Sequence, residues 1–514
     1  MKKKIRLGVL VIILAGIVVS FGLLVACQTP GRGDTWIPRR VVRTYNTDVL
    51  IVGGGGSGLA CAVQAAINGT DFILIEKTGL LGGSANKVEG MFAIDSRFQR
   101  ELGIDIKPVQ IVYAELVRKQ FRPNGALWVD LSRSSAGNIE WLMQQGVRFS
   151  GRVCDLFGSA LYPTMHWFEG EVGAIGFTPH MERVLRERNA TIHLETRART
   201  LIKENGRIVG VYAETREGAV RYNAKVVVIA TGGFGGNPQL IAKQGWDIEG
   251  MTLSGNLNIV GDGYLMAMAV GAKDFMPHSA GAGIYQIPAF PNVIYNQPFH
   301  PLSGLFGVAS GGPVLWVNEN AVRFANEGLR TENLVIQAVP GKTNRANFVI
   351  FDQNIFDTFF GTSDDARNMF EASLVTNQGN SIFRENSIEG MARRFNLDPA
   401  TLRATIERYN RFVAQGADED FGKPERFLVP IAQPPFYIAQ LRMDFLFSAG
   451  GIWTNGNNQV LDNNRNPIPG LYAIGMDGTM LYRNVYTINM PGTAIAEAIH
   501  SGRRVANHLR DYLR

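Results

Sequence analysis

A glycine-rich turn between two apolar segments is the part of the chain whose residue types and spacing point most clearly to chemistry. An apolar run ends at Val52 and is followed by Gly53, Gly55 and Gly58 in the spacing G-x-G-x-x-G. In such a turn the first glycine allows the tight bend, the second lets backbone N–H groups approach a pyrophosphate, and the third lets the next helix pack closely on the strand. Glu76 ends a second predicted strand, at the distance where an acidic side chain accepts hydrogen bonds from an adenosine ribose. The pattern predicts a dinucleotide-binding βαβ unit.

Three later segments have the composition of further strands and turns of the same unit. Residues 224–233 form an apolar run that ends in Ala-Thr-Gly-Gly, and they follow an apolar segment at 192–196 and a hairpin-like segment at 207–213. Residues 261–263 read Gly-Asp-Gly and lead into a predicted helix. We therefore expect more than one strand to end beside the glycine turn.

The C-terminal part of the chain predicts a last strand and a last helix. Residues 470–477 are largely apolar and end in Asp477. Pro491 is expected in the first turn of the following helix, because proline loses no hydrogen bond there. The positive end of such a helix can face the edge of a flavin that becomes negative on reduction.

In this order and spacing, the motifs resemble the FAD-dependent fumarate reductase and succinate dehydrogenase flavoprotein family, in particular soluble fumarate reductases, with urocanate reductase and 3-ketosteroid Δ1-dehydrogenase as relatives. The resemblance covers roughly residues 45–514. It implies an α/β fold in which a doubly wound, Rossmann-like FAD-binding domain carries an inserted α+β capping domain. The expected parts are a lipoprotein signal peptide at 1–26, a tether at 27–45, the first part of the FAD-binding domain at 46–274, the capping domain at 275–430 and the second part of the FAD-binding domain at 431–514.

The cofactor that the resemblance implies is FAD. We expect it to be bound non-covalently, because covalent members of the family use a histidine and none lies between Gly82 and Ile94. The expected contacts lie in the motifs quoted above. They are Gly53, Gly55, Gly56, Ser57, Gly58, Glu76, Lys77, Gly82, Gly83, Ser84, Ala230, Thr231, Gly232, Asp262, Asp477, Thr493, Ala494 and Ile495.

The expected active site departs from the family pattern. Glu327 and Arg330 match two members of the Arg-Glu-Arg chain that delivers the proton in fumarate reductases; the alternative is a surface pair about one helical turn apart. The family's proton-donating arginine, a histidine and a further arginine correspond here to Phe356, Phe447 and Asn489. A cavity lined in this way would hold a dicarboxylate at a cost of several kcal/mol. Fumarate is therefore not the expected substrate.

Tyr486 and Arg483 are the leading candidates for proton transfer, because a phenol beside a cation has a lowered pKa and can act as an acid or a base. The alternative is a tyrosine packed on the helix and an arginine paired at the surface. His278 and His300 both compete for a Gln-x-His-Pro position of the family, and each is a weaker candidate. The histidines show no metal-ligand spacing, so we expect no metal site.

The expected activity is that of a FAD-dependent oxidoreductase acting on CH–CH groups, which reduces an activated C=C bond of a small unsaturated molecule by flavin hydride transfer. Two rivals remain: a ketosteroid-dehydrogenase-like enzyme working in the oxidative direction, and a non-catalytic flavoprotein that binds a ligand or relays electrons. The chain has no second G-x-G-x-x-G segment. We therefore expect an external electron donor, which is a quinol-linked partner, a cytochrome or a flavin carrier.

The N-terminus resembles a bacterial lipoprotein signal. Four of residues 2–6 are basic, residues 7–26 carry no charge, and Leu-Val-Ala-Cys ends at Cys27, which would be lipidated. The alternative is an uncleaved transmembrane helix. Both interpretations place the body of the protein on the extracytoplasmic face of the cell membrane or in the periplasm.

The net charge of the chain does not indicate a nucleic-acid partner. Cleavage of the signal would remove four positive charges and lower the formal charge from +6 to +2. No basic tract is interleaved with aromatic residues, so we expect no nucleic-acid partner.

Overall fold

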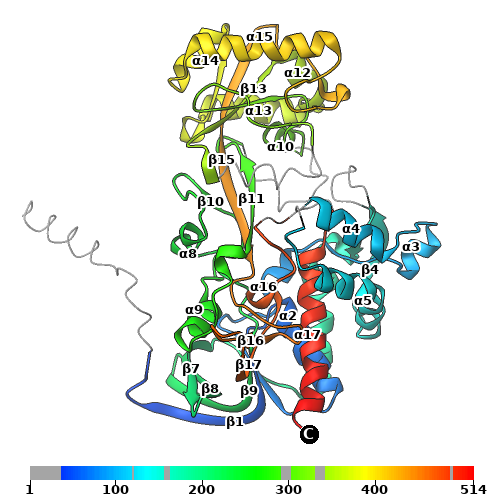
Figure 1. The fold of residues 1–514 in the computed structure, drawn as a ribbon, viewed down its shortest axis with the longest axis vertical. Coiled ribbons are helices and arrows are strands. Elements are labelled where there is room, and N and C mark those ends of the chain that lie inside the picture. The colour runs from blue at the N-terminus through cyan, green and yellow to red at the C-terminus, as the bar shows by residue number, and fades with distance from the viewer. Residues whose placement is uncertain are drawn as a thin grey trace, which may run out of the picture. The chain divides into compact units, whose positions relative to one another are not determined.

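The computed structural model shows three β-sheets with helices packed on them (Figure 1). Residues 1–37 form one unit and residues 38–514 the other, and the fold described here is that of the second unit. The structure describes residues 36–118, 121–154, 162–290, 303–329, 342–484, 486 and 490–514. The expected signal peptide, Cys27, His300, Arg330 and Asn489 lie outside these ranges.

The first sheet is the dinucleotide-binding sheet. Its central strands are parallel, in the order β16-β17-β9-β1-β2-β6, with β16 antiparallel at one end and a β7–β8 hairpin added to β9. The strands are β1 (Val41–Val52), β2 (Phe72–Ile75), β6 (Thr191–His193), β7 (Arg197–Glu204), β8 (Arg207–Thr215), β9 (Gly218–Ile229), β16 (Gln459–Leu461) and β17 (Pro467–Ala473).

Both faces of this sheet are covered, which explains why its central strands are continuously apolar. Along β1, Leu50 and Val52 belong to one hydrophobic cluster, whereas Val49 and Ile51 belong to the other, because side chains alternate between the faces of a strand. On one face, α2 (Gly56–Ile67) packs along α17 (Thr493–Tyr512) (Figure 1). The expected doubly wound α/β fold is confirmed.

The second sheet is built around the long strand β15, which pairs with four other strands. Helices α14 and α15 lie with this sheet in Figure 1. Since β15 begins only at Phe436, the sheet includes a strand that follows the end of the expected capping domain, and the expected domain boundaries stay predictions. The elements are β10 (Thr252–Leu253), β11 (Ala280–Gln286), β12 (Leu315–Asn318), β13 (Asn347–Asp352), β14 (Ile382–Glu385), β15 (Phe436–Ala449), α10 (Ser303–Ser310), α12 (Gln353–Ile355), α13 (Asp364–Thr376), α14 (Ile388–Arg394) and α15 (Pro399–Gln415).

A small third sheet and the remaining helices complete the described part of the chain. No helix within the described residues combines the length and the apolar character that crossing a membrane requires. The elements are β3 (Gly90–Phe92), β4 (Phe149–Cys154), β5 (Met165–Phe168), α3 (Arg97–Glu101), α4 (Pro108–Arg118), α5 (Gly125–Gln144), α6 (Gly173–Gly176), α7 (Thr178–Glu187), α8 (Pro238–Lys243), α9 (Asp262–Ala269) and α16 (Gly475–Gly478).

One expected helix start is wrong. Helix α17 begins at Thr493 with Gly492 as its N-cap, so Pro491 precedes the helix instead of occupying its first turn. Gly492 has a φ of 81°, a left-handed conformation that glycine adopts without strain. The chain therefore turns sharply into α17 at Gly492.

The turn between β1 and α2 leaves no room for larger residues. A Cβ atom on Gly58 would lie 1.9 Å from the carbonyl oxygen of Gly53, and one on Gly53 would lie 2.3 Å from that of Ala230. Gly53 also has a φ of 110°. The spacing of these glycines is thus required by backbone-to-backbone contact as well as by any ligand.

We expect Gly58→Ala to lower the free energy of unfolding by about 1–3 kcal/mol, the usual cost of overpacking a closed site. Urea denaturation followed by circular dichroism measures the change. Gly137→Ala is the matched control: it lies inside helix α5, a Cβ there meets nothing within 4 Å, and alanine is worth about 1 kcal/mol more than glycine in a helix. Equal stability of the parent and Gly58→Ala would contradict this account of the turn.

Candidate functional site

Glu76 holds the glycine turn from the neighbouring strand. Its Oε2 accepts a hydrogen bond from the Gly54 N–H at 2.8 Å, and its Oε1 accepts one from the Thr78 N–H at 2.8 Å. The Gly53 N–H donates to the Ile75 carbonyl at 2.8 Å. The carboxylate therefore lies at the edge of the turn, as a ribose contact requires, and that contact stays a prediction.

Helix α2 presents open backbone N–H groups beside this turn. Its N-cap Gly55 makes no side-chain capping bond, its first turn has no acidic residue, and its first helical bond runs from the Leu59 N–H to the Gly55 carbonyl. The amides of Gly56, Ser57 and Gly58 precede that bond, so they lie at the positive end of the helix dipole. A Cβ on Gly55 would meet only one atom, the Gly82 carbonyl oxygen, at 3.9 Å. This open space next to a helix N-terminus fits the pyrophosphate of FAD.

The segment at residues 82–84 lies against the same turn, as expected. The Gly82 N–H donates to the Gly54 carbonyl at 2.8 Å, and Gly55 and Gly82 form an isolated parallel bridge. Gly82 has a φ of 97°, and Gly83 and Ser84 begin a short 3-10 helix. The structure thus brings two glycine-rich segments of the sequence to one place.

Asp477 joins the ends of β9 and β17. Its side chain accepts hydrogen bonds from the Gly232 N–H at 2.8 Å, the Gly233 N–H at 3.1 Å and the Thr231 hydroxyl at 3.0 Å. Burial raises the pKa of Asp477 to about 6, although these bonds favour the ionised form. Its oxygens are therefore engaged by the protein, a structural role that the sequence did not indicate.

Asp262, at the start of α9, pairs with two cations from the first sheet. Its carboxylate lies 2.8 Å from Lys77 Nζ and 2.7 Å from an Arg197 nitrogen. Burial opposes ionisation, but the hydrogen bond from Arg197 and the charge of Lys77 outweigh it and lower the pKa of Asp262. Lys77 and Asp262, both expected near the cofactor, are thus brought together.

The N-terminus of α17 lies next to that of α2. A Cβ on Gly56 would lie 2.7 Å from Ile495 Cδ1. The N-cap Gly492 makes no side-chain capping bond, and the first turn, which contains Thr493 and Ala494, has no acidic residue. Two positive helix ends therefore converge at the expected FAD site.

An aromatic cluster covers the N-terminus of α17. The Tyr486 ring packs edge-on against Phe447, at a centroid distance of 4.9 Å, and against Tyr482, at 5.0 Å. The Tyr482 hydroxyl donates to Thr493 Oγ1 at 2.7 Å, and Tyr486 also has the Thr493 side chain and the Ala494 backbone N–H as hydrogen-bond partners. We call Phe447, Tyr482 and Tyr486 the aromatic cluster.

The expected pairing of Tyr486 with Arg483 is wrong. Burial raises the pKa of Tyr486 to about 12, whereas a neighbouring cation would lower it. The Arg483 guanidinium instead lies over the ring of Phe275, at 5.9 Å. Tyr486 is 6% exposed and packed at the helix, as the alternative interpretation had it.

The His278 side chain is exposed, which does not suit a residue that binds a buried ligand. Its ring is 5.9 Å from those of Phe275 and Trp453, and its backbone carbonyl accepts a hydrogen bond from the Asn484 N–H at 3.1 Å. The structure therefore brings His278 and Arg483 to one phenylalanine and does not bring either to the aromatic cluster through any contact among the described residues.

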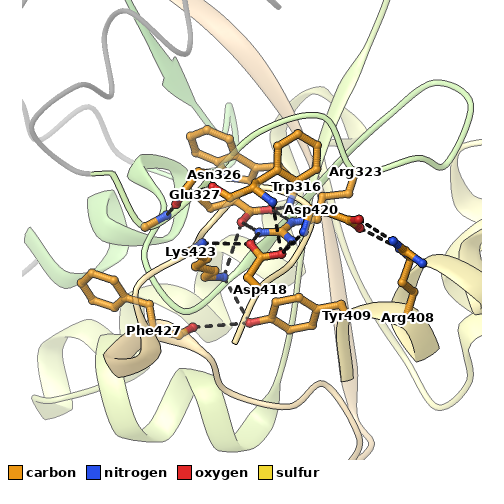
Figure 2. A network of polar contacts seen from close by, with 12 residues as sticks. Trp316, Arg323, Asn326, Glu327, Arg408, Tyr409, Asp418, Asp420, Lys423 and Phe427 are labelled. Carbon is orange, nitrogen blue, oxygen red and sulfur yellow. Dashed lines mark hydrogen bonds and ion pairs between the residues drawn. The ribbon is translucent and has the colours of Figure 1, made fainter. Parts of the chain in front are cut away.

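Glu327 belongs to a buried charge network within the second sheet (Figure 2). Arg323 donates to Glu327 at 2.9 and 2.8 Å and to Asp418 at 2.8 Å from each of two nitrogens. Lys423 Nζ lies 3.5 Å from Glu327 Oε2, and the Trp316 N–H donates to Glu327 at 3.1 Å. The interpretation of Glu327 as part of a surface pair is wrong, because its side chain is fully buried.

Sequence reasoning missed most of this network. Arg323 stands one helical turn before Glu327, which is a usable signal, but Asp418 and Lys423 lie far along the chain with no spacing that links them. Two cations balance two carboxylates, and burial lowers the pKa of Lys423 to about 8. The balance favours a positioning role for Glu327, and its place in a proton relay stays a prediction.

Phe356 and Phe447 belong to different hydrophobic clusters. Its ring stacks on Phe370 at a centroid distance of 4.1 Å, within the hydrophobic cluster of the second sheet, whereas Phe447 packs against the other cluster. The expectation that both phenylalanines replace ionic contacts in one pocket stays a prediction. Asn489, the third expected replacement, lies outside the described residues.

We expect Glu76→Ala to weaken FAD binding by about 1–3 kcal/mol, because it removes a charged acceptor that orders Gly54 and Thr78 and is placed for the ribose. Titration of the apoprotein with FAD, followed by flavin fluorescence, measures the affinity. Glu187→Ala, which removes an exposed ion pair with Arg183, is the control. Unchanged affinity in Glu76→Ala would show that this carboxylate does not support the cofactor.

Comparison with known proteins agrees with this geometry. Residues 48–487 match the family described as FAD binding domain. The chain is 30% identical over 487 residues to vinyl phenol reductase of Lactiplantibacillus plantarum. This match covers 90% of this chain and 96% of that protein. It is 26% identical over 448 residues to urocanate reductase of Eggerthella lenta. This match covers 84% of this chain and 70% of that protein.

A solved structure shows the same fold. It is that of 3-ketosteroid-Δ4-(5α)-dehydrogenase from Rhodococcus jostii in complex with 4-androstene-3,17-dione, with a TM-score of 0.71 and 20% sequence identity over 92% of this chain and 100% of that one. The match to the family model spans most of the chain, and the open helix termini fit its cofactor. The chain therefore belongs to the FAD-binding domain family and is an FAD-dependent oxidoreductase of the fumarate reductase type.

Proposed function

We propose that this protein reduces a C=C bond conjugated to an aromatic ring or a carbonyl group in a neutral or mono-anionic small molecule. The observation that carries the proposal is the aromatic cluster at the N-terminus of α17, which offers apolar and phenolic surface where the family resemblance implies ionic contacts. Vinyl phenol reductase, a relative over nearly the whole chain, supports a substrate of the vinyl phenol class.

Tyr486 is the proposed proton donor. Bound FAD would supply the hydride to one carbon of the double bond. Because burial holds the pKa of Tyr486 at about 12, the phenol stays protonated at neutral pH and is ready to donate to the adjacent carbon.

A dicarboxylate suits this surface poorly. Among the described residues, the rings of Phe447 and Tyr482 pack against Tyr486, and the guanidinium of Arg483, an expected cation of the site, lies over Phe275. A carboxylate buried without a counter-charge costs several kcal/mol. One carboxylate can stay at a solvated edge, but two on a short chain cannot both do so.

We further propose that the protein is exported, lipid-anchored at Cys27 and supplied with electrons from outside. The lipobox-like Leu24–Cys27 segment supports the anchor. A single G-x-G-x-x-G segment, which the FAD site uses, supports an external donor such as a quinol-linked protein, a cytochrome or a flavin carrier.

We expect the reduced enzyme to be reoxidised by vinyl phenols, cinnamate-type acids and enones far faster than by fumarate. We also expect Tyr486→Phe to slow reoxidation by these compounds by about 10²–10⁴-fold, while FAD binding is unchanged. Stopped-flow absorbance of the flavin measures the reoxidation rates of the parent and the variant. Tyr285→Phe, at a buried tyrosine of β11 outside the aromatic cluster, is the control.

Efficient reoxidation by fumarate would refute the proposed substrate class. Full activity of Tyr486→Phe would refute the proposed donor. Reduction of the flavin by saturated ketones, with no reoxidation by any of the unsaturated compounds, would show that the enzyme works in the oxidative direction.

We expect Cys27→Ala to release the protein from membranes, since each buried CH₂ of an acyl chain contributes about 0.8 kcal/mol to anchoring. Fractionation of cells, followed by mass spectrometry of the N-terminus, measures the result. A variant that still sediments with membranes and retains residues 1–26 would favour the transmembrane alternative.

A further inference from the structure

Helix α4 carries a strip of large apolar side chains that face solvent. Val109 is 71% exposed, Tyr113 is 66% exposed and Val117 is 44% exposed. They are spaced by four residues, so they follow one another along one side of the helix. Phe121, a further four residues along the chain, is 69% exposed. We call Val109, Tyr113, Val117 and Phe121 the α4 strip.

Phe121 lies just beyond the end of α4 and is held there by the backbone. Its N–H donates a hydrogen bond to the Leu116 carbonyl at 2.6 Å. Phe121 has a φ of 57°, a left-handed conformation that a bulky residue seldom adopts. The chain therefore turns at Phe121 and leaves its ring in solvent.

The opposite side of α4 is buried. Ile111 belongs to the same hydrophobic cluster as Tyr486, and Glu115 is fully buried. Through this side the helix packs on α5. The buried side thus holds α4 in the fold, and the α4 strip is left over. Apolar side chains gathered at one place on a surface are typical of a binding site.

The charge around the α4 strip is positive. Glu115 is the only acidic residue of α4, and it faces inward. Residues 116–129 carry three positive charges and no negative charge. Arg122 is exposed and pairs with no acidic side chain among the described residues. Lys107, just before the helix, is already paired with Asp105 at 2.5 Å, so it adds little to this positive charge.

Apolar and aromatic side chains beside unpaired positive charge suit the surface of a bilayer that contains anionic phospholipid. The apolar side chains of such an element lie at the boundary of the headgroups and acyl chains, and the cations are attracted to the lipid phosphates. Tyrosine is enriched at this boundary. A second copy of the chain suits the α4 strip less well, because a symmetric dimer would bring the same positive charges together.

We propose that the α4 strip docks this protein on a bilayer that contains anionic phospholipid. In the docked state the strip enters the headgroup region and Arg122 lies at the phosphates. A lipid anchor on a flexible tether holds a protein near a membrane, whereas the α4 strip also fixes which side of the protein faces the lipid. The proposal does not rest on the proposed anchor or on the proposed reaction, because the strip belongs to the folded unit of residues 38–514.

Helix α5 connects the docking side to the aromatic cluster. The Trp128 ring of α5 packs edge-on against Tyr482 at a centroid distance of 6.1 Å, and Trp128 Nε1 donates to the Leu481 carbonyl at 3.0 Å. Since α4 packs on α5, docking holds the aromatic cluster near the membrane. Apolar unsaturated molecules concentrate there, because burial of their apolar surface in lipid is favourable.

The test uses the full, FAD-loaded chain with vesicles of phosphatidylglycerol and phosphatidylcholine in which part of the lipid carries bromine on its acyl chains. Bromine quenches tryptophan fluorescence only at short range, so it reports which residues enter the lipid. We compare Tyr113→Trp with Val375→Trp, whose position on α13 is 85% exposed. Each variant adds one tryptophan to the parent. We expect the brominated lipid to quench the tryptophan added at position 113 and to leave that at position 375 unchanged.

A second variant tests the charge. In the Tyr113→Trp protein, we expect Arg122→Gln to lower the ratio of docked to undocked molecules by about fivefold, which corresponds to about 1 kcal/mol for one positive charge at an anionic surface. Arg216→Gln, which removes an exposed arginine between β8 and β9, is the matched control and should leave the ratio unchanged. Vesicles of phosphatidylcholine alone should likewise give less quenching at position 113.

Three outcomes would overturn the proposal. Equal quenching at positions 113 and 375 would show that the lipid does not select the α4 strip. An unquenched tryptophan at position 113 whose emission shifts to shorter wavelength as the protein is concentrated without vesicles would assign the strip to a second copy of the chain. Equal effects of Arg122→Gln and Arg216→Gln would exclude binding to anionic lipid through Arg122. None of these readouts requires turnover, so the proposed reaction is tested separately.

Discussion

The structure depends on how the carboxyl ends of three parallel strands are held together. Strands β1, β9 and β17 are far apart in the sequence, yet their last residues form one edge. The buried carboxylate of Asp477 ties this edge by accepting bonds from Thr231, Gly232 and Gly233. Burying such a group is costly unless its oxygens are satisfied, so the satisfied arrangement is strongly preferred over any looser one. The glycine turn, Glu76 and the two helix N-termini are all placed relative to this edge.

The same edge explains why the site attracts negative charge at one position and avoids it at another. Helices α2 and α17 both begin with a glycine N-cap and with no acidic residue in the first turn, so no carboxylate neutralises their positive ends. Where α2 begins, the open space suits phosphate. Where α17 begins, phenol and phenylalanine rings cover the helix end instead, and their low polarity raises the pKa of Tyr486. Apolar surroundings thus convert a helix end from an anion site into a site that keeps a phenol protonated.

The buried network of Arg323, Glu327, Asp418 and Lys423 shows a different solution to the cost of burying charge. Every charge there has an opposite partner within a few ångströms, and the guanidinium binds two carboxylates at once. Such networks hold segments rigidly, because removing one member leaves the others uncompensated. In this protein the network fixes the loop after β12 to the loop after α15 (Figure 2). It therefore holds these two loops of the second sheet together.

The sequence by itself determined the βαβ unit, the family and the cofactor, because glycine spacing and continuous apolar strands are local consequences of backbone geometry. It also indicated Glu76, Lys77, Asp262 and residues 82–84 as residues of one site, and the structure places them around the glycine turn and the start of α9. Only the tertiary structure decided the surroundings of each candidate side chain. Arg483 follows Tyr482 directly in the chain, yet it turns to Phe275, and Glu327 finds Asp418 and Lys423 from a distant loop. Phe356 and Phe447, which the family resemblance assigns to one pocket, pack in different hydrophobic clusters. A pKa depends on burial and on partners that are distant in sequence, so no local pattern could have given the raised value at Tyr486.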